Sequence, residues 1–437
     1  MTTNMLQKTD KLLSTEGKKL KVLEYIGSGG QGEVYRVEYS GNKDFALKWY
    51  FPQNATNEQL EMLKISVKTG SPDQRFLWPQ AIVRSNENPD LFGYVMPFRP
   101  KQFRSATEML SRKIEPSFQS LMTACYQLAD SFLQLHSKGL SYRDISINNV
   151  FIDPDKGDIL ICDNDNVSYE GSSYTGVAGT PKYMAPEIVR NESQPNKYTD
   201  LYSLSVLLFF MCYIAHPLDG KREAAIHAFD ELAQKKLYGI NPLYIFHPTD
   251  KSNEPDPEFH SNALAFAQVF PKVLRDEFER AFTIGLFEPA KRVEESVWRK
   301  LFVKLRDNII ICQECGVEIF YDISKVKQNE PLACWCCNKN AATPPRMRLN
   351  NEIIILSKSI KLFPHHTNGI LYDFTKPTAE ISEHPILKIL GLKNLSEDIW
   401  YVTKPDNSIV QIQPGRSFAL ENGFSVKFEL LKAEIKT

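Results

Sequence analysis

The stretch Ser-Tyr-Arg-Asp-Ile-Ser-Ile-Asn-Asn, residues 141–149, places a carboxylate and a carboxamide five residues apart in a polar loop. Asp144 can accept a hydrogen bond, and later the proton, from an attacking hydroxyl group. Asn149 offers a neutral oxygen to Mg²⁺, and Asp163, which follows an apolar strand pattern, offers a hard carboxylate to the same ion. These three side chains suit phosphoryl transfer, which requires mainly positioning and neutralisation of charge.

A glycine-rich turn earlier in the chain is suited to holding phosphate. Gly27, Gly29, Gly32 and Val34 form the pattern G-x-G-x-x-G-x-V between two predicted strands. Glycine lets backbone amides approach phosphate oxygens that a Cβ would keep away. A dinucleotide-binding fold needs a helix after the third glycine, whereas an alternating strand pattern follows here. Taken alone, the segment is equally well interpreted as a glycine hairpin without a ligand.

Lys48 ends the next predicted strand, where an ammonium group can pair with the α and β phosphates of a nucleotide if a carboxylate holds it. The helix predicted at 55–69 carries two candidate carboxylates, Glu58 and Glu61. Glu61 is preferred because it falls in the middle of the helix, and the choice between the two stays open.

Four cysteines form a second candidate site. Cys312-x₂-Cys315 and Cys334-x₂-Cys337 are separated by 18 residues. Each pair offers two thiolates to one tetrahedral ion, so the pattern predicts a structural Zn²⁺ site in a zinc ribbon, with Cys336 left over. Zinc ribbons also bind nucleic acid, but the charges between the cysteine pairs are mixed, which favours a scaffold role.

The elements that must position these residues are predicted from pattern and composition. The chain has 437 residues, a length typical of two to four domains, and its net charge of −1 excludes a chain-wide attraction to nucleic acid or anionic membranes. No long apolar run or signal peptide is found, which predicts a cytoplasmic location. The predicted parts are a flexible N-terminus at 1–19, a mostly β lobe at 20–97, a helical lobe at 98–307, a zinc ribbon at 308–342, a linker at 343–351 and a β-sandwich at 352–437.

In order and spacing, the motifs from residue 21 to about 305 resemble those of the protein kinase superfamily. The resemblance implies a two-lobed α+β kinase fold, ATP as substrate and Mg²⁺ as cofactor. It implies an ATP site made of Gly27, Gly29, Gly32, Val34, Lys48, Glu61, Met96 and Phe98, and a catalytic set of Asp144, Lys48, Asn149 and Asp163. It also implies structural roles for Arg143, Thr180, Glu187, Asp200 and Arg292, where Asp200 supports the catalytic loop and Arg292 pairs with Glu187.

The departures from the family pattern lie in the catalytic and metal-binding loops. Tyr142 stands where the family has histidine, and Ser146 replaces the lysine that serine/threonine kinases place near the γ-phosphate. Asn164 and Asp165 replace Phe-Gly after the metal-binding aspartate, and Asp165 is an alternative metal ligand to Asp163. A nucleotide-binding pseudokinase scaffold is therefore the alternative to an active kinase.

Thr180, in Gly-Thr-Pro-Lys-Tyr-Met-Ala-Pro-Glu, resembles the serine/threonine rather than the tyrosine pattern, so the predicted acceptor is serine or threonine. The preceding segment offers four candidate autophosphorylation sites, which are Ser168, Ser172, Ser173 and Thr175. A flexible polar loop whose hydroxyls only interact with water is the other interpretation of this segment.

Two resemblances concern the C-terminal part. The order of kinase, four-cysteine ribbon and β module resembles the bacterial eukaryote-like kinases of the TerY-type phosphorylation triad, which is linked to tellurite resistance. That resemblance implies partners of the von Willebrand A type and the PP2C phosphatase type, in a signalling system. Residues 390–428 also resemble forkhead-associated domains, which bind phosphothreonine, although that family's Gly-Arg and Ser-x-x-His motifs cannot be placed in them.

Overall fold

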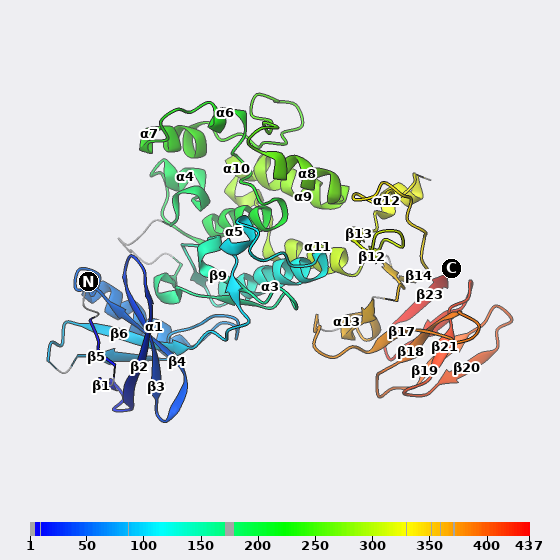
Figure 1. Ribbon diagram of the computed structural model, residues 1–437, viewed down its shortest axis with the longest axis horizontal. Helices are drawn as coiled ribbons and strands as arrows, with labels where there is room; N and C mark the ends of the chain where they lie inside the picture. The colour runs from blue at the N-terminus through cyan, green and yellow to red at the C-terminus, as the bar shows by residue number, and fades with distance from the viewer. Residues whose placement is uncertain are drawn as a thin grey trace. The chain divides into compact units, whose positions relative to one another are not determined.

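The computed structural model describes residues 5–437 except residues 9, 86, 171–178, 329, 351, 359, 370 and 371, and without the side chains of 326 and 327. The chain divides into two compact units (Figure 1). The first comprises residues 1–267 and 275–300, and the second comprises residues 268–274 and 301–437. The described part of the chain is mixed helix and sheet, with an all-β region at its C-terminal end.

The described N-terminal residues form a closed barrel in the order β1-β2-β3-β4-β6-β5. Its strands are β1 (Lys11–Ser14), β2 (Lys19–Ser28), β3 (Gly32–Tyr39), β4 (Asn42–Tyr50), β5 (Ala81–Arg84) and β6 (Phe92–Pro97). The flexible N-terminus predicted at 1–19 is wrong for its described part. β1 pairs with both β2 and β5, and Leu6 and Leu12 are buried in the barrel core.

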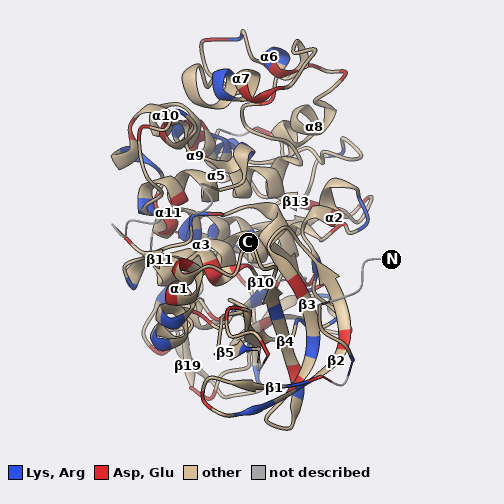
Figure 2. Ribbon diagram, turned by 90° about the vertical axis from the view of Figure 1, so that its left-hand side faces the viewer, with Lys and Arg blue, Asp and Glu red and all other residues tan. Residues whose placement is uncertain are grey.

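Helix α1 (Asn57–Thr69) packs beside the barrel, in contact with β5. Thr56 begins it, because the Thr56 side chain accepts a hydrogen bond from the backbone N–H of Gln59 at 3.2 Å. Gly70, with φ of 72°, ends it. Leu60 and Leu63 turn inward and pack in a cluster with strands β4 and β6. Acidic and basic residues both occur along the helix (Figure 2).

The rest of the first unit is mainly helical. Its α-helices are α2 (Thr107–Leu110), α3 (Phe118–Ser137), α4 (Pro186–Val189), α5 (Lys197–Tyr213), α6 (Lys221–Ala224), α7 (Glu231–Gln234), α8 (Ser261–Val269), α9 (Lys272–Phe282), α10 (Ile284–Phe287) and α11 (Glu295–Arg306), of which α8, α9 and α11 continue into the second unit. Almost every residue of α5 is buried, which explains its apolar sequence. Among the described residues, no helix is both long and apolar enough to cross a membrane.

Short strands carry the polar loops of this helical part. They are β7 (Arg104–Ser105), β8 (Leu140–Ser141), β9 (Val150–Ile152), β10 (Ile159–Ile161) and β11 (Ser168–Tyr169). β9 and β10 form an antiparallel hairpin in which Val150 is opposite Ile161. Asn149 directly precedes β9 and Asp163 follows β10 by two residues. The hairpin therefore brings these two side chains to the same end.

In the second unit, β12 (Ile309–Ile311) and β13 (Glu318–Phe320) form a hairpin around the first cysteine pair, followed by α12 (Ile323–Lys327). Two sheets follow, one of six strands in the order β15-β14-β23-β22-β19-β20 and one of four in the order β16-β17-β18-β21. Their bounds are β14 (Arg346–Leu349), β15 (Glu352–Ile355), β16 (Lys361–Leu362), β17 (Ala379–Glu383), β18 (Leu390–Asn394), β19 (Trp400–Thr403), β20 (Ile409–Ile412), β21 (Ser417–Ala419), β22 (Ser425–Lys427) and β23 (Lys432–Lys436), with α13 (Pro364–Thr367) after β16.

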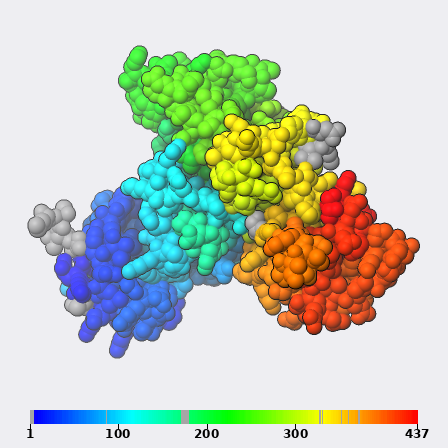
Figure 3. Space-filling model, turned by 45° about the vertical axis from the view of Figure 1, so that its right-hand side comes forward, coloured from blue at the N-terminus to red at the C-terminus, as the bar shows by residue number. Residues whose placement is uncertain are grey.

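Both sheets bury residues in one core, for example Leu392 from the smaller and Val426 from the larger, so the predicted all-β region is present. It is the orange to red body in Figure 3. The linker predicted at 343–351 is wrong at its centre, where β14 pairs with β15 and β23. Its Met347 is fully buried, although the segment is rich in arginine.

Candidate active site

The loop after β8 is held by one buried carboxylate. Asp200, on α5, accepts hydrogen bonds from the backbone N–H groups of Tyr142 at 2.6 Å and Arg143 at 2.9 Å. Arg143 has φ of 74°, a conformation that needs such support from its surroundings. The Tyr142 hydroxyl donates to the backbone carbonyl of Cys162, so the tyrosine ties this loop to the segment before Asp163. Asp200 thus holds the backbone of the loop that contains Asp144.

Asp144 lies in this loop and is partly exposed. Its Oδ1 accepts hydrogen bonds from the backbone N–H of Thr180 at 2.8 Å and from the Thr180 hydroxyl at 2.7 Å. Asn149 donates through Nδ2 to the Asp144 backbone carbonyl at 2.9 Å and, at 3.4 Å, to Oδ2. Its amide oxygen is then the atom left to act as a ligand. Gly179, with φ of 112°, packs against the backbone of this loop, and a Cβ at that position would lie 2.9 Å from the Arg143 carbonyl oxygen.

Asp163 is the carboxylate that the hairpin brings to this end. It adopts a left-handed conformation with φ of 53°, and its side chain is 49% exposed. Burial of the carboxyl group raises the pKa of Asp163, the Lys48 ammonium opposes the rise, and the carboxylates of Asp165 and Asp144 add to it. Asn149 and Asp163 lie at the same end of the hairpin, and amide and carboxylate oxygens are ligands that Mg²⁺ accepts.

Lys48 meets a different partner from the predicted one. Its buried Nζ lies 2.8 Å from Asp165 Oδ2 and 3.3 Å from Asp163 Oδ1. Glu61 is 65% exposed and pairs with Lys64 at 2.6 Å, so the predicted pairing of Glu61 with Lys48 is not formed. Glu58 is exposed as well.

Gln59 holds the inward position on α1. Its Nε2 donates to the Asp165 backbone carbonyl at 2.9 Å and to the Tyr50 hydroxyl at 3.1 Å, and that hydroxyl in turn contacts the Asp165 carboxylate. Burial alone lowers the pKa of the Lys48 ammonium, but the charges of Asp165 and Asp163 outweigh it and raise that pKa above its ordinary value. Lys48 is therefore a charged donor. The sequence does show Asp165, as the second aspartate of Asp-Asn-Asp, but its pattern suggested only an alternative metal ligand and not a partner for Lys48.

The glycine turn is a hairpin between β2 and β3, in which the Gly29 N–H donates to the Gly32 carbonyl at 2.9 Å. A Cβ on Gly32 would lie 2.2 Å from the Trp49 carbonyl oxygen, whereas Cβ atoms on Gly27 and Gly29 would meet no protein atom within 4 Å. Packing therefore explains Gly32 but not the other two. The turn is linked to Lys48, because Lys48 Nζ donates to Gln31 Oε1 at 2.8 Å.

The remaining predicted ATP-site residues lie on the barrel. Val34 is opposite Lys48 in the pairing of β3 with β4, and Met96 is opposite Ala46 in the pairing of β4 with β6. Phe98 follows β6, and its backbone N–H donates to the Asp44 carbonyl at 2.9 Å.

The predicted structural pair is formed in the helical part. Arg292 donates from two nitrogens to the two carboxylate oxygens of Glu187, each at 2.8 Å. The same guanidinium group also donates to the carbonyls of Gly285 and Tyr198. A buried bidentate pair of this kind fixes the segment that follows Thr180.

Two departures from the family pattern are buried. Ser146 is 1% exposed, and within the described residues its hydroxyl has no hydrogen-bond partner. It therefore cannot take over the place of a lysine that reaches towards a phosphate. Asn164 donates through Nδ2 to the carbonyls of Leu77 and Ile161, each at 3.0 Å, which anchors the segment where the family has phenylalanine.

The candidate phosphorylation sites are only partly described. Ser168 is buried in β11, where it is opposite Ser141 of β8, so its hydroxyl is not accessible in this conformation. Ser172, Ser173 and Thr175 lie outside the described residues.

A buried histidine next to the catalytic loop makes the first unit sensitive to pH. His136 Nε2 lies 3.1 Å from Asp200, and Nδ1 contacts Glu295. Burial lowers the pKa of His136, but the two carboxylates outweigh it and raise that pKa from 6.5 to about 9. Their contribution to stability is complete below pH 6.5 and is lost as pH rises through about 9.

We therefore expect the free energy of unfolding of the first unit to fall by up to about 3 kcal/mol over this pH range. Urea unfolding at a series of pH values, followed by tryptophan fluorescence, measures the change. In His136→Asn the protein is less stable at low pH and the pH-dependent loss is absent. A wild-type stability that is constant or increases over the same range would contradict the assignment.

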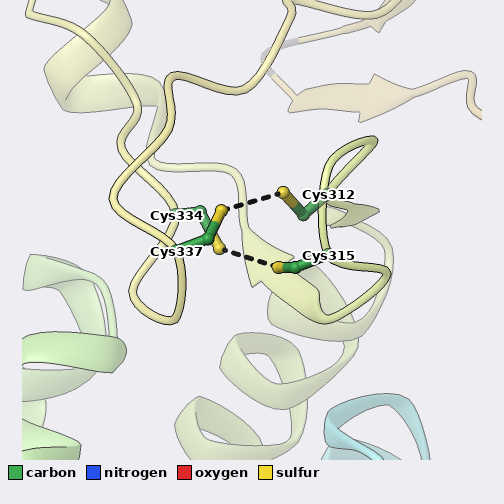
Figure 4. A group of neighbouring side chains, drawn as sticks. All are labelled: Cys312, Cys315, Cys334 and Cys337. Atoms are coloured by element: carbon green, nitrogen blue, oxygen red, sulfur yellow. Dashed lines mark hydrogen bonds between the residues drawn. The ribbon is translucent and has the colours of Figure 1, made fainter.

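The four predicted zinc ligands also converge (Figure 4). Cys312 and Cys337 have sulfur atoms 3.7 Å apart, and those of Cys315 and Cys334 are 3.6 Å apart. A tetrahedron with Zn–S bonds of about 2.3 Å has sulfur–sulfur edges of about 3.8 Å, so the donor set fits Zn²⁺.

The two cysteine pairs have the same backbone turn. Gly316, with φ of 78°, follows the first pair and donates to the Cys312 carbonyl at 3.0 Å, while Asn338, with φ of 56°, follows the second and donates to the Cys334 carbonyl at 2.9 Å. Cys336 is exposed and belongs to neither pair of contacts.

Comparison with known families matches residues 20–275 to the protein kinase domain. Serine/threonine-protein kinase CTR1 of Arabidopsis thaliana is 25% identical over 50% of this chain and 27% of its own length. Protein kinase C delta type of Homo sapiens is 30% identical over 45% of this chain and 29% of its own length. Protein kinase gsk3 of Schizosaccharomyces pombe is 23% identical over 64% of this chain and 73% of its own length. The chain thus spans less than a third of the first two of these relatives.

Proposed function

This chain belongs to the protein kinase family, and we propose that it transfers the γ-phosphoryl group of Mg·ATP to serine and threonine hydroxyls of proteins, its own included. The observation that carries the proposal is the convergence of Asp144, Asn149 and Asp163 with the buried ammonium of Lys48. All four are the residue types that phosphoryl transfer uses.

The proposal gives each of these side chains a role. Asp144 accepts the hydrogen bond of the attacking hydroxyl and then its proton, while Thr180 donates to the same carboxylate and orients it. Asn149 and Asp163 would hold Mg²⁺, which supplies positive charge to the phosphate oxygens. Lys48 binds the α and β phosphates from the other side, and the N–H groups of the glycine turn cover them.

Two observations bear on the alternative, a nucleotide-binding pseudokinase. Ser146 supplies no cation for the γ-phosphate, and Lys48 has no helix carboxylate. In favour of an active kinase, the chain keeps the proposed base, Asp144, and both proposed metal ligands, Asn149 and Asp163. We favour a kinase, because the charge on Lys48 is maintained by other groups.

The test is a transfer assay with purified protein, labelled ATP and Mg²⁺, with phosphosites mapped by mass spectrometry. We expect label on serine or threonine of the wild type and none on Lys48→Ala, because that variant loses the phosphate-binding cation. Mapping also tests Ser172, Ser173 and Thr175. Measurable ATP binding by the wild type without any transfer would contradict the proposal and identify a pseudokinase.

For the second unit we propose a Zn²⁺ ion held by Cys312, Cys315, Cys334 and Cys337, with a structural role because four thiolates leave no open position. Cysteines that bind a metal ion, rather than forming disulfides, are typical of a reducing compartment, which supports the cytoplasm as the location. The resemblance to the TerY-type triad supports von Willebrand A-type and PP2C-type partners, and the resemblance to forkhead-associated domains supports phosphopeptide binding by the sandwich. Nucleic-acid binding by the ribbon is the alternative.

A further inference from the structure

Lys48 is a buried cation in need of a fixed counter-charge, and α1 does not provide one. The side chain of Lys48 is 6% exposed. A buried ammonium without a carboxylate loses its proton or its fixed position. The helix turns Gln59 towards this region, while its two glutamates are exposed.

We propose that Asp165 is the positioning residue for Lys48, so that the carboxylate that fixes the phosphate-binding ammonium comes from the metal loop and not from α1. This inference rests on the proposed function. It assigns the two aspartates of Asp-Asn-Asp separate tasks: Asp163 binds the metal ion and Asp165 holds the lysine.

The contacts of the two carboxylates support this division. Asp165 is fully buried, and its Oδ2 accepts from Lys48 Nζ at 2.8 Å and from the Tyr50 hydroxyl. Asp163 lies farther from Lys48, at 3.3 Å, and is half exposed, so it is accessible to a metal ion. The more buried and closer carboxylate is the one that fixes the cation.

The position of Asp165 is itself determined by its neighbours. Gln59 Nε2 donates to the Asp165 backbone carbonyl at 2.9 Å, and Tyr50, whose hydroxyl also accepts from Gln59, lies two residues after Lys48 on β4. In this arrangement α1 reaches Lys48 through Asp165, by neutral hydrogen bonds. Because the Gln59 side chain is within two hydrogen bonds of Lys48, a charge placed at residue 59 lies near the same ammonium.

The remaining oxygen of Asp165 defines the rival assignment. Within the described residues, Asp165 Oδ1 is buried without a hydrogen-bond partner. If that oxygen bound the metal ion, Asp165 would be a ligand and Lys48 a secondary contact. The experiment therefore measures both the metal requirement and the state of Lys48.

The experiment moves the charge from one residue to the other in the full chain. We expect Asp165→Asn to lower kcat about 100-fold, since small displacements of a positioning group cost rates of that order. Gln59→Glu alone also lowers kcat, because it buries a second carboxylate beside Asp165. In the double variant the charge is restored, and kcat is expected to recover at least about tenfold over Asp165→Asn.

Two controls separate positioning from folding. Glu61→Gln removes the exposed carboxylate of α1 and leaves kcat unchanged, and thermal unfolding verifies that each variant is folded. If Glu61→Gln is inactive while Asp165→Asn keeps its rate, the proposal is overturned. It is equally overturned if the double variant is slower than both single variants, because a purely structural role for Asp165 predicts additive losses.

A readout that needs no catalysis keeps the test independent of the proposed function. An amine-reactive ester is added at one fixed pH, and mass spectrometry measures how much Lys48 it labels. We expect several-fold more labelling in Asp165→Asn than in the wild type, whether or not the wild type transfers phosphate. Equal labelling together with a raised Mg²⁺ requirement would identify Asp165 as a metal ligand and overturn the proposal.

Discussion

Replacing Asp144 by asparagine is expected to lower the rate of phosphoryl transfer about 1,000-fold, because the attacking hydroxyl loses the carboxylate that accepts its proton. Asparagine keeps the shape of the side chain and an oxygen that can accept from Thr180, so the loop should stay in place. In the proposed site ATP would contact the glycine turn and Lys48 rather than this residue, so the ATP affinity is expected to remain within about twofold. Transfer rates and nucleotide titrations measure the two quantities separately.

A matched control removes a carboxylate from the turn of the β9–β10 hairpin, at the end away from Asn149 and Asp163. Asp158 precedes β10 and accepts a hydrogen bond from Gln127 at 2.8 Å, away from the catalytic loop. Asp158→Asn should therefore keep both the rate and the ATP affinity. A transfer rate for Asp144→Asn within about tenfold of the wild type would contradict the assignment of Asp144 as the base.

Removing the proposed Zn²⁺ from the four-cysteine site is expected to unfold the segment around it, with the largest effect on stability of the changes proposed here. Binding of Zn²⁺ to such sites contributes on the order of 10 kcal/mol or more at neutral pH, whereas the hairpin of β12 and β13 adds only a few side chains, such as Ile310 and Ile319, to the core of the second unit. Incubation with a strong chelator should release zinc, measured by atomic emission, and change the near-ultraviolet circular dichroism. Cys315→Ser should produce the same change without a chelator.

Cys336→Ser is the control for this experiment, because Cys336 adjoins the site but is exposed and not among its four sulfurs. It should retain zinc and the wild-type spectrum. If the second unit selects partners, chelation should also reduce capture of the von Willebrand A-type and PP2C-type proteins of the native host. Folded protein without zinc would show that the cysteines serve another purpose.

Residues whose chemistry depends on short spacing could be predicted from the sequence. The loop with Asp144 and Asn149, the glycine turn and the cysteine pairs each occupy a few consecutive residues, so their local geometry follows from the chain itself. The pairing of Arg292 with Glu187 joins residues far apart in the sequence. It was expected only through the family resemblance.

The partner of Lys48 could not be predicted, because it depends on the rotation of α1 about its axis. Successive helical residues are separated by about 100°. Glu58 lies one such step from Gln59, and Glu61 lies about 160° away, on nearly the opposite side. The pattern of apolar and polar residues does not define the rotation of α1 precisely enough to tell which side chain faces Lys48. The packing of Leu60 and Leu63 against the barrel determines that rotation.

The strands β1 and β14 were missed for a different reason. Both are short and lie in polar sequence, so neither carries a pattern long enough to indicate a strand. They are strands because each completes a sheet formed by distant residues, β1 between β2 and β5 and β14 between β15 and β23. The backbone hydrogen bonds of this pairing stabilise each strand, and the strand propensity of its own few residues gives no sign of them.

The barrel closure by β1 has a consequence for any shortened version of this protein. The kinase family match begins at residue 20, whereas β1 ends at Ser14. A fragment cut at the family boundary would expose the unpaired N–H and C=O groups of β2 and β5 and uncover the apolar surface beneath Leu12. Open edges of this kind serve as templates for pairing between molecules, so such a fragment would be prone to aggregate even though it keeps every catalytic residue.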